Sequence, residues 1–523
     1  MPESRVGTGW DERLGVWWIA ENRPHEPAIV ASPGGTMTFG ELAGRAHQVV
    51  HALRSLGVED GDTVAVLMRN GPDIVVWSLA CQEAGWYFLP LNYNLRPNEV
   101  AAIVEHSQAR VFVASVATAD IARQVTPPAS TIRIAVGGDL DGFMPDHEVL
   151  AGHPTTLPED RRPGAVFTYT SGTTGRPKGV RRRRPEGDPR DVAAQSTVFG
   201  RAFGWTPFGG PHLVAAAMHH VGTHSFFMGA LHVGHGLVIM PRFDPEKALQ
   251  LISDHRITTG YMVPTMFHRL LQLPDDVRDA SDTSSLRSIV HGAAPCPRIV
   301  KERMMAWWGP VLWESYGGSE GAATIAKPHR WLEKPGTVGR AIRGVQVTIL
   351  DDDGNELRRG ETGNVYIETE VKPFEYHGDD AQTDDVFKGR SFTIGDIGYL
   401  DEDGYLFLRD RAKDVIISGG VNVYPAEIEA VLSGHAAVGD AAVIGVPHPE
   451  WGERVKAVVV PVAGGAAGPD LEQELIAYCR EHLASFKCPD SVDFRDELPR
   501  TDSGKLYKRL IRDEYWAAAA GDI

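Results

Sequence analysis

The chain has 523 residues, of which 42% are apolar and 23% charged, with a formal net charge of −17 at pH 7. This length exceeds what one hydrophobic core supports, so we expect two or more domains of a soluble globular protein. The acidic balance argues against a general binder of nucleic acid or anionic membranes. The sequence has no apolar run as long as a membrane span, no signal-peptide core at its start and no metal-like cysteine spacing. We therefore expect a cytoplasmic protein with free thiols.

Between residues 36 and 115, short apolar runs alternate with amphipathic ones, and residues 165–300 repeat this style. Such alternation predicts an α/β architecture of layered parallel sheets and helices. The predicted strands are Thr63–Met68, Tyr87–Leu91 and Val111–Ala114, and the predicted helices are Ile74–Glu83 and Glu99–His106.

The pattern changes near residue 336. Two alternating runs, Val345–Leu350 and Asn364–Glu368, flank turn residues such as Gly354, which predicts a small antiparallel β subdomain. Past Arg411 the chain restarts with its own elements. These are the apolar runs Ala442–Val446 and Val455–Val462 and the helix Leu471–His482, with a flexible Gly/Ala/Pro connection at 463–469. We predict a large N-terminal domain over residues 1–410 and a small, mobile α+β cap over residues 411–523.

A glycine- and hydroxyl-rich segment, Tyr169–Val180, is the most informative part of the chain. It reads Tyr-Thr-Ser-Gly-Thr-Thr-Gly-Arg-Pro-Lys-Gly-Val and follows an apolar run. Its glycines let backbone N–H groups approach a ligand, its hydroxyls donate hydrogen bonds and Lys178 adds a positive charge, which suits a polyphosphate. It is not a Walker A loop, because Pro177 stands in place of the second glycine and Gly179 in place of Ser or Thr.

The segment resembles the phosphate-binding signature of the adenylate-forming superfamily, which includes acyl-CoA synthetases, aryl-CoA ligases, luciferases and peptide-synthetase adenylation domains. Further matching segments follow in the superfamily's order, and the resemblance runs from about residue 36 to residue 512. These segments are His291–Pro295, Glu314–Glu320, Phe392–Tyr399, Asp410–Gly420 and Pro499–Lys505. The resemblance implies that the protein uses ATP, Mg²⁺ and coenzyme A. The implied ATP-binding residues are Thr170, Ser171, Gly172, Thr173, Thr174, Gly175, Lys178, Gly292, Ala293, Ala294, Pro295, Glu314, Ser315, Tyr316, Ser319, Asp396 and Arg411.

The resemblance also implies individual roles around the nucleotide. Tyr316 would lie against the adenine, and Ser319, where threonine is usual, would touch the α-phosphate. Glu320 would hold Mg²⁺ as a hard carboxylate ligand. Asp396 would accept hydrogen bonds from the ribose, and Arg411 would contact the ribose or a phosphate.

The cap would supply the remaining functions by the same resemblance. Lys413 would be the hinge, and Ser418, Gly419 and Gly420 would line a pantetheine tunnel after the cap rotates. Lys505 would bridge the acid oxygen and the α-phosphate, because the attack of a carboxylate on ATP brings like charges together. The implied reaction makes an acyl-adenylate and pyrophosphate, and then an acyl-CoA and AMP.

The segment Met218–Phe226 carries the histidines of the predicted acid pocket. His220 and His224 have a zinc-like spacing but lack the glutamate of that motif, so a metal site is disfavoured. The resemblance assigns His220 to orienting the acid, and leaves His219 and His224 as pocket or core residues. The predicted acid-pocket residues are His219, His220, Gly222, His224, Val263, Gly317 and Gly318.

The small residues of this set predict room for a wide acid, polycyclic or branched. The segment Met218–Gly222 and the pair Tyr507–Lys508 also resemble those of ligases for bulky steroid or terpenoid acids. An aryl or medium-chain fatty acid stays open. An amino acid is disfavoured, because the sequence offers no charged anchor for a polar side chain.

Four consecutive arginines, Arg181–Arg184, follow the phosphate segment. They predict either a solvated, charge-balancing loop or a contact with the phosphates of CoA or with an acidic carrier protein.

The sequence thus predicts an ATP-dependent acyl-CoA synthetase acting on a hydrophobic acid. An adenylating enzyme that passes its acyl group to a carrier protein or a partner acyltransferase is the nearest alternative, and an inactive nucleotide-binding regulator is a second. We expect no nucleic-acid partner and leave a homodimer open.

Overall fold

The computed structural model describes residues 14–32, 35–170, 178–418, 421–448, 451–462, 464–465, 467–500 and 505–521. In these ranges, no helix combines the length and apolar character that crossing a membrane requires. All four cysteines are free thiols.

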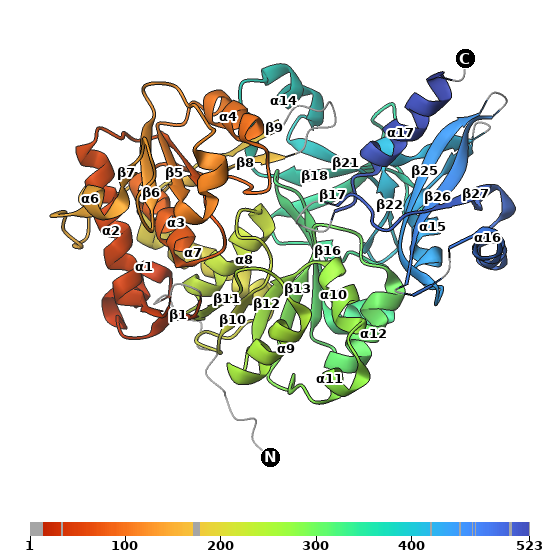
Figure 1. Cartoon of the computed structure of the whole chain (residues 1–523), viewed down its shortest axis with the longest axis horizontal. Helices are drawn as coiled ribbons and strands as arrows, with labels where there is room; N and C mark the ends of the chain where they lie inside the picture. The colour runs from red at the N-terminus through yellow and green to blue at the C-terminus, as the bar shows by residue number, and fades with distance from the viewer. Residues whose placement is uncertain are drawn as a thin grey trace.

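An eight-stranded sheet occupies the N-terminal part of the chain, at the left of Figure 1. Six of its strands are parallel, and those at its centre are buried on both faces, as expected for a parallel sheet covered by helices. The strand order is β19 (Phe374–Tyr376), β9 (Lys178–Arg182), β8 (Ala165–Thr170), β4 (Tyr87–Pro90), β3 (Thr63–Leu67), β5 (Val111–Ser115), β6 (Ile132–Val136) and β7 (Met144–Pro145).

Two helices that pack against this sheet are at the places that the sequence predicts, α3 (Pro72–Ala84) and α4 (Pro97–His106). A further helix, α2 (Phe39–Ser55), packs against α3. Helix α2 begins at a capping box, in which Thr38 accepts from the backbone of Glu41 and the Glu41 carboxylate accepts from the backbone of Thr38. The strands and helices predicted between residues 63 and 115 are therefore confirmed within one or two residues at each end.

A nine-stranded sheet forms a second layer, and most of its strands are drawn in yellow to green below the middle of Figure 1. Its central strands are parallel, and antiparallel strands close both edges. The strand order is β16 (Arg340–Ala341), β15 (Ala322–Ala326), β14 (Leu312–Gly317), β13 (Ser288–His291), β12 (Thr259–Met262), β10 (His212–Val214), β11 (Leu237–Ile239), β1 (Pro27–Ala31) and β2 (Met37–Thr38).

Helix α8 (Val221–His232) lies between the two layered sheets. Its His224 ring stacks on Phe88 of β4, with ring centroids 5.3 Å apart. Its Phe226 ring stacks on Tyr261 of β12 at 4.5 Å. A helix held between two sheets is buried nearly all round, which explains why this segment is almost uniformly apolar.

A five-stranded antiparallel sheet follows, which confirms the predicted β subdomain. It contains β17 (Val345–Leu350), β18 (Gly363–Thr369), β21 (Ser391–Leu400), β20 (Phe387–Lys388) and β22 (Leu406–Arg411). Strands β17 and β18 pair from Val345 opposite Thr369 to Leu350 opposite Asn364.

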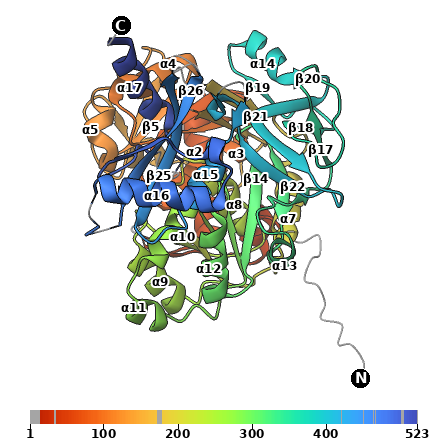
Figure 2. The ribbon, with the colours of Figure 1, turned by 90° about the vertical axis from the view of Figure 1, so that its right-hand side faces the viewer.

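The C-terminal part has its own sheet and core, shown in blue in Figure 1. The strands are β24 (Val421–Val423), β23 (Ile416–Ser418), β26 (Gly452–Pro461), β25 (Val438–His448) and β27 (Ser491–Phe494). Figure 2 shows α15 (Pro425–Leu432) and α16 (Pro469–His482) beside β25 and β26. The predicted connection spans residues 463–469, but its last residue, Pro469, is already the first residue of α16. Proline suits this position because its fixed φ matches the first helical turn.

Candidate active site

The ends of the predicted phosphate loop lie side by side. Strand β8 ends at Thr170 and the antiparallel strand β9 begins at Lys178, directly opposite it. The residues between them, including Ser171, Gly172, Thr173, Thr174 and Gly175, lie outside the described ranges, so their role stays a prediction. The Lys178 ammonium lies 5.0 Å from the centre of the Tyr376 ring on β19.

The turn between β14 and β15 brings Glu320 to the same place. The Gly318 backbone N–H donates to the Gly321 carbonyl at 2.8 Å, which closes the turn. The Tyr376 hydroxyl donates to Glu320 Oε1 at 3.0 Å. Burial and the Glu320 charge raise the pKa of Tyr376, so this phenol stays a neutral donor. Lys178, Tyr376 and Glu320 therefore form one cluster beside the loop ends.

Glu320 suits a magnesium ion. One carboxylate oxygen takes the Tyr376 hydrogen bond, and a carboxylate keeps further lone pairs for a cation. Mg²⁺ is usually held by one or two carboxylates together with substrate phosphates. Among the described residues there is accordingly no cluster of three or more His, Cys, Asp or Glu side chains that would form an all-protein metal cage.

Tyr316 and Asp396 meet at the junction of two sheets. The Tyr316 hydroxyl donates to Asp396 Oδ2 at 2.7 Å, and Arg411 Nε contacts Asp396 Oδ1 at 2.7 Å. Asp396 and Arg411 are direct partners in the ladder between β21 and β22. Burial and the Asp396 charge raise the pKa of Tyr316 well above its usual value. The buried Asp396 carboxylate, predicted to bind the ribose, thus contacts both Tyr316, predicted to lie against the adenine, and Arg411.

Lys505 lies in the electrostatic reach of these groups. Its pKa is lowered to about 8, chiefly by burial and then by the charges of Arg411 and Lys413, against the opposing effect of the Asp396 and Asp414 charges. Lys505 is therefore near Asp396 and Arg411, two of the residues predicted to bind the nucleotide.

The predicted hinge and pantetheine residues lie where one sheet ends and the next begins. Lys413 is in the 3₁₀ turn Ala412–Asp414, between β22 and β23. Its carbonyl accepts a 3.5 Å hydrogen bond from Arg512 of α17 (Lys508–Gly521). Ser418 ends β23 and pairs with Val421 and Gly452, whereas Gly419 and Gly420 are outside the described ranges.

The predicted adenine segment leaves β13 through a constrained backbone. A Cβ on Gly292 would lie 2.5 Å from the Ser315 carbonyl oxygen, so only glycine permits this approach. Ala293 has a φ of 67°, in the left-handed region that costs an alanine about 1–2 kcal/mol. Such strain concentrates at ligand sites. Ala294 and Pro295 continue the segment towards α12 (Arg298–Trp308).

Glu314 has a partner that the sequence analysis missed. Its Oε2 lies 2.7 Å from Lys301 Nζ of α12 and 3.7 Å from His291 Nε2. Burial and the Lys301 charge hold the pKa of His291 well below its usual value, so His291 is neutral. Lys301 is fully buried, with its ammonium 4.6 Å from the centre of the Trp331 ring. The Glu314 carboxylate is therefore engaged in the core, and the predicted contact with ATP would have to come from its backbone.

His219 and His220 precede α8, and both lie near aromatic side chains. Their rings are 4.2 Å apart, and His219 packs edge-on against Tyr93 at 5.0 Å. Burial and the neighbouring His220 keep the pKa of His219 well below its usual value. His224 instead lies in the core, where its Nε2 is 2.6 Å from the Ser78 hydroxyl of α3. Burial lowers its pKa to about 3. This is the core alternative that the sequence left open for His224.

The small residues of the predicted acid pocket do not all leave space. A Cβ on Gly222 would lie 2.8 Å from the Tyr261 hydroxyl, so Tyr261 fills the room beside this glycine. A Cβ on Gly317 would lie 2.4 Å from the Gly321 carbonyl, so the tight turn explains that glycine. A Cβ on Gly318 would meet the Glu320 carboxylate at 2.5 Å. Val263 is buried at the start of α10 (Pro264–Leu271).

Comparisons with known proteins place the chain in a family. Two family models match the chain: AMP-binding enzyme over residues 16–371, and AMP-binding enzyme C-terminal domain over residues 427–505. The fatty acid–acyl-carrier-protein ligase ScoC of Streptomyces coeruleorubidus is 32% identical over 512 residues, covering 96% of each chain. A feruloyl-CoA synthase from Amycolatopsis is 33% identical over 520 residues, covering 97% of this chain and 99% of the relative.

Solved structures are similar along nearly the whole chain. The anthranilate CoA ligase AuaEII, bound to anthranoyl-AMP, has a TM-score of 0.85 and 25% identity, covering 99% of this chain and all of that one. ATP-bound MatB of Rhodopseudomonas palustris has a TM-score of 0.80 and 30% identity, covering 96% of this chain and 99% of that one.

The chain belongs to the AMP-binding enzyme family, because the first model alone matches more than half of it. It is an AMP-forming acid–thiol ligase that uses ATP, Mg²⁺ and CoA, and it couples ATP-dependent adenylation of an acid to acyl transfer. The alternative of an inactive nucleotide-binding regulator is therefore set aside.

Proposed function

We propose that this ligase activates an apolar carboxylic acid. In this proposal, Lys178, Glu320 and Lys505 act on the phosphates and the acid, and Tyr316, Asp396 and Arg411 hold the nucleotide. The observation that supports this most is the meeting of Tyr316, Asp396, Arg411 and Lys505. These residues come from three distant segments, and together they suit an adenine face, a ribose and an α-phosphate.

The first step forms the acyl-adenylate. A carboxylate oxygen of the acid attacks the α-phosphorus of ATP, and the bond to the β-phosphate breaks to release pyrophosphate. Lys505 supplies the positive charge between the two anions, and Lys178 faces the departing phosphates. Magnesium bound at Glu320 neutralises phosphate charge when it is present.

The second step requires that a thiol, instead of Lys505, lie beside the carbonyl group of the acyl-adenylate. A thiolate attacks the acyl carbon, and the bond to AMP breaks. In our proposal the cap, residues 411–523, turns about Lys413, so that Lys505 leaves and the Ser418–Gly420 segment arrives. The hinge position is supported by the passage between the antiparallel sheet and the cap sheet at Ala412–Asp414.

For the substrate we propose an apolar acid, with a bulky polycyclic or branched acid as the specific candidate. Several aromatic rings lie near His220 and Gly222, namely those of Tyr93, His219, Phe226 and Tyr261. Such a lining suits an apolar acid without a charged side chain. Because Tyr261 fills the room beside Gly222 and the Glu320 carboxylate fills the room beside Gly318, extra width would have to come from another side of the pocket.

A product assay tests both the proposed reaction and the proposed substrate. The full chain is incubated with ATP, Mg²⁺ and a panel of fatty, aryl and polycyclic acids, each with and without CoA. We expect AMP, pyrophosphate and an acyl-CoA for one acid class. ADP as product, or no turnover with any acid, would contradict the proposed reaction. Turnover of short fatty acids alone would reject the bulky substrate.

A carrier protein as acceptor is the second candidate, favoured by the acyl-carrier-protein ligase among the relatives. Both acceptors present the same pantetheine thiol, so the acceptor must be measured. The same assay with a phosphopantetheinylated carrier protein separates them. Acylation of the carrier at a much higher kcat/KM than CoA would support this candidate.

A further inference from the structure

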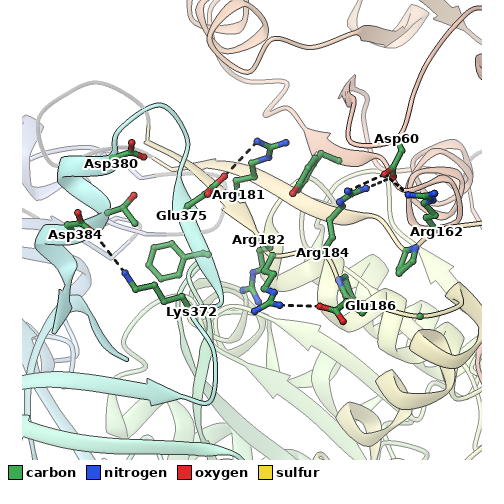
Figure 3. A pocket seen from close by; sticks show the side chains of 17 residues that line it. Asp60, Arg162, Arg181, Arg182, Arg184, Glu186, Lys372, Glu375, Asp380 and Asp384 are labelled. Carbon is green, nitrogen blue, oxygen red and sulfur yellow. Dashed lines mark hydrogen bonds and ion pairs between the residues drawn. The ribbon is translucent and has the colours of Figure 1, made fainter. Parts of the chain in front are cut away.

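An open cavity of about 890 Å³ lies at the end of β9 that is remote from the predicted phosphate loop. Figure 3 shows the side chains that surround this space, which come from β9 and the residues after it, from the start of β19 and from α14 (Asp380–Val386). The size is within the range of sites for small molecules.

The arginines of the run Arg181–Arg184 all line this cavity. The predicted solvated loop is wrong for the first two residues, because Arg181 and Arg182 belong to β9 and both are half-buried. With Arg162 and Lys372, the cavity has six cationic side chains against five carboxylates. The wall thus has a positive excess in a chain with a net charge of −17.

Part of the wall is rigidly held. Arg162 and Arg184 both pair with the one carboxylate of Asp60, and Arg184 also donates to the Gly85 carbonyl at 2.7 Å. The Arg181 guanidinium lies 4.1 Å from the centre of the Tyr87 ring. Fixed guanidinium groups lose little freedom when they bind an anion.

Other cations of the wall have weak partners. Arg181 contacts Glu375 at 3.7 Å and Lys372 contacts Asp384 at 3.9 Å, both too long for a hydrogen bond. The Arg181 Nε–H is buried and has no hydrogen-bond partner within the described part of the chain. Arg183 pairs with Glu186 at 3.2 Å, but both side chains are exposed, so this pair contributes little. The exposed donors of Arg183 and Lys372 therefore remain available to a ligand.

Arg182 connects the cavity to the active site. Its Nε donates to the Ser319 carbonyl at 2.9 Å, in the turn that carries Glu320. Burial lowers the pKa of Arg182, and the Glu320 charge raises it. An anion that contacts Arg182 would therefore act on the turn predicted to hold the α-phosphate and magnesium.

We propose that this cavity is a second anion site that binds a phosphate-bearing ligand. Through the Arg182 hydrogen bond to Ser319, a bound anion would change the affinity of the Ser319–Glu320 turn for ATP. Arginine forks match phosphate oxygens in paired, charge-assisted hydrogen bonds. The phosphate has two plausible sources: the nucleotide end of CoA, or free phosphate and pyrophosphate. Binding itself is independent of the proposed function, whereas the signal to the turn rests on it.

The test compares a double variant, Arg183→Gln with Lys372→Gln, with the control Arg190→Gln. Arg190 is a surface arginine paired with Glu21 at 3.0 Å, and it does not line the cavity. Binding of adenosine 3′,5′-bisphosphate, pyrophosphate and phosphate is measured by calorimetry on the full chain, with a non-hydrolysable ATP analogue filling the nucleotide site. We expect wild type and control to bind one anion per chain, and the double variant to bind about tenfold more weakly or worse.

The outcomes distinguish the two phosphate sources, and they distinguish failure of the anion site from failure of the proposed ligase function. Tightest binding of the bisphosphate identifies the nucleotide end of CoA, and binding of pyrophosphate or phosphate alone identifies a free anion. Equal affinity in double variant and wild type, or no binding to either, overturns the site. The signal requires that the bound anion change the KM for ATP in wild type but not in the double variant. Since binding is read without turnover, failure of the site leaves the ligase activity as a separate question.

Discussion

The hydroxyl of Tyr316 donates a 2.7 Å hydrogen bond to Asp396, 80 residues further along the chain. This bond joins β14 of the nine-stranded sheet to β21 of the antiparallel sheet. The second oxygen of Asp396 contacts Arg411. A single buried carboxylate thus sets the distance between the predicted adenine face and the residues that lead into the cap.

Tyr316→Phe is expected to weaken ATP binding while keeping the aromatic face. A hydrogen bond to a charged group is worth roughly 1.5–3 kcal/mol, so we expect the KM for ATP to rise about tenfold or more. The KM for the acid should change little. Tyr399→Phe is the matched control, because Tyr399 lies on the same strand as Asp396 but stacks on Phe407. Equal effects of the two substitutions on ATP would contradict the special role of Tyr316.

Lys505 should impose a pH limit on adenylation. Its pKa is lowered to about 8, so the ammonium loses its proton as the pH rises through that value. We therefore expect kcat/KM for pyrophosphate release, which reports the free enzyme, to fall above about pH 8. Lys505→Ala should reduce this step by about 10²–10³ while sparing thioester formation from supplied acyl-adenylate. Equal loss in both half-reactions would reject the assignment.

Lys413→Pro should affect the other half-reaction. Proline fixes φ and would restrict the turn between β22 and β23. We expect normal pyrophosphate release and a slow transfer from supplied acyl-adenylate to CoA. Lys413→Ala, which keeps backbone freedom, serves as the control. Unimpaired transfer in the proline variant would place the hinge elsewhere.

Gly222→Ala should be disruptive because of one neighbour. The new methyl group would lie 2.8 Å from the Tyr261 hydroxyl. We expect a higher KM for the acid, with partial recovery in the double variant Gly222→Ala and Tyr261→Phe, which removes that oxygen. Separate and additive effects of the two substitutions would mean that the residues do not share the space.

Lys301→Met should destabilise the fold around the adenine segment. It leaves Glu314 buried without its cation, which costs about 3–5 kcal/mol. The thermal unfolding midpoint should fall by several degrees. Adding Glu314→Gln removes the unpaired charge and should restore part of the loss. If the single and double variants melt together, the buried pair does not contribute in this way.

Much of the fold could be predicted from the sequence, because it depends on local patterns. Alternating apolar runs indicate strands and amphipathic runs indicate helices, and the elements between residues 63 and 115 follow these patterns closely. The family could also be recognised, since the phosphate segment and the motifs around Tyr316, Asp396 and Lys505 are contiguous stretches with a defined spacing.

Tertiary packing decided which of these residues meet, and what fills the space between them. Lys301 and Glu314 pair because α12 packs beside the ends of β13 and β14, and no local pattern signals a buried lysine there. Tyr261 occupies the room that Gly222 alone suggested. Two arginines of the run, Arg181 and Arg182, belong to a strand and are half-buried there, because the neighbouring strands cover part of their surface. The order and spacing of residues within a motif are set by the sequence, so the family's motifs could be recognised from it. The distances between motifs in space are set by how the sheets and helices pack, so contacts such as Lys301–Glu314 could not.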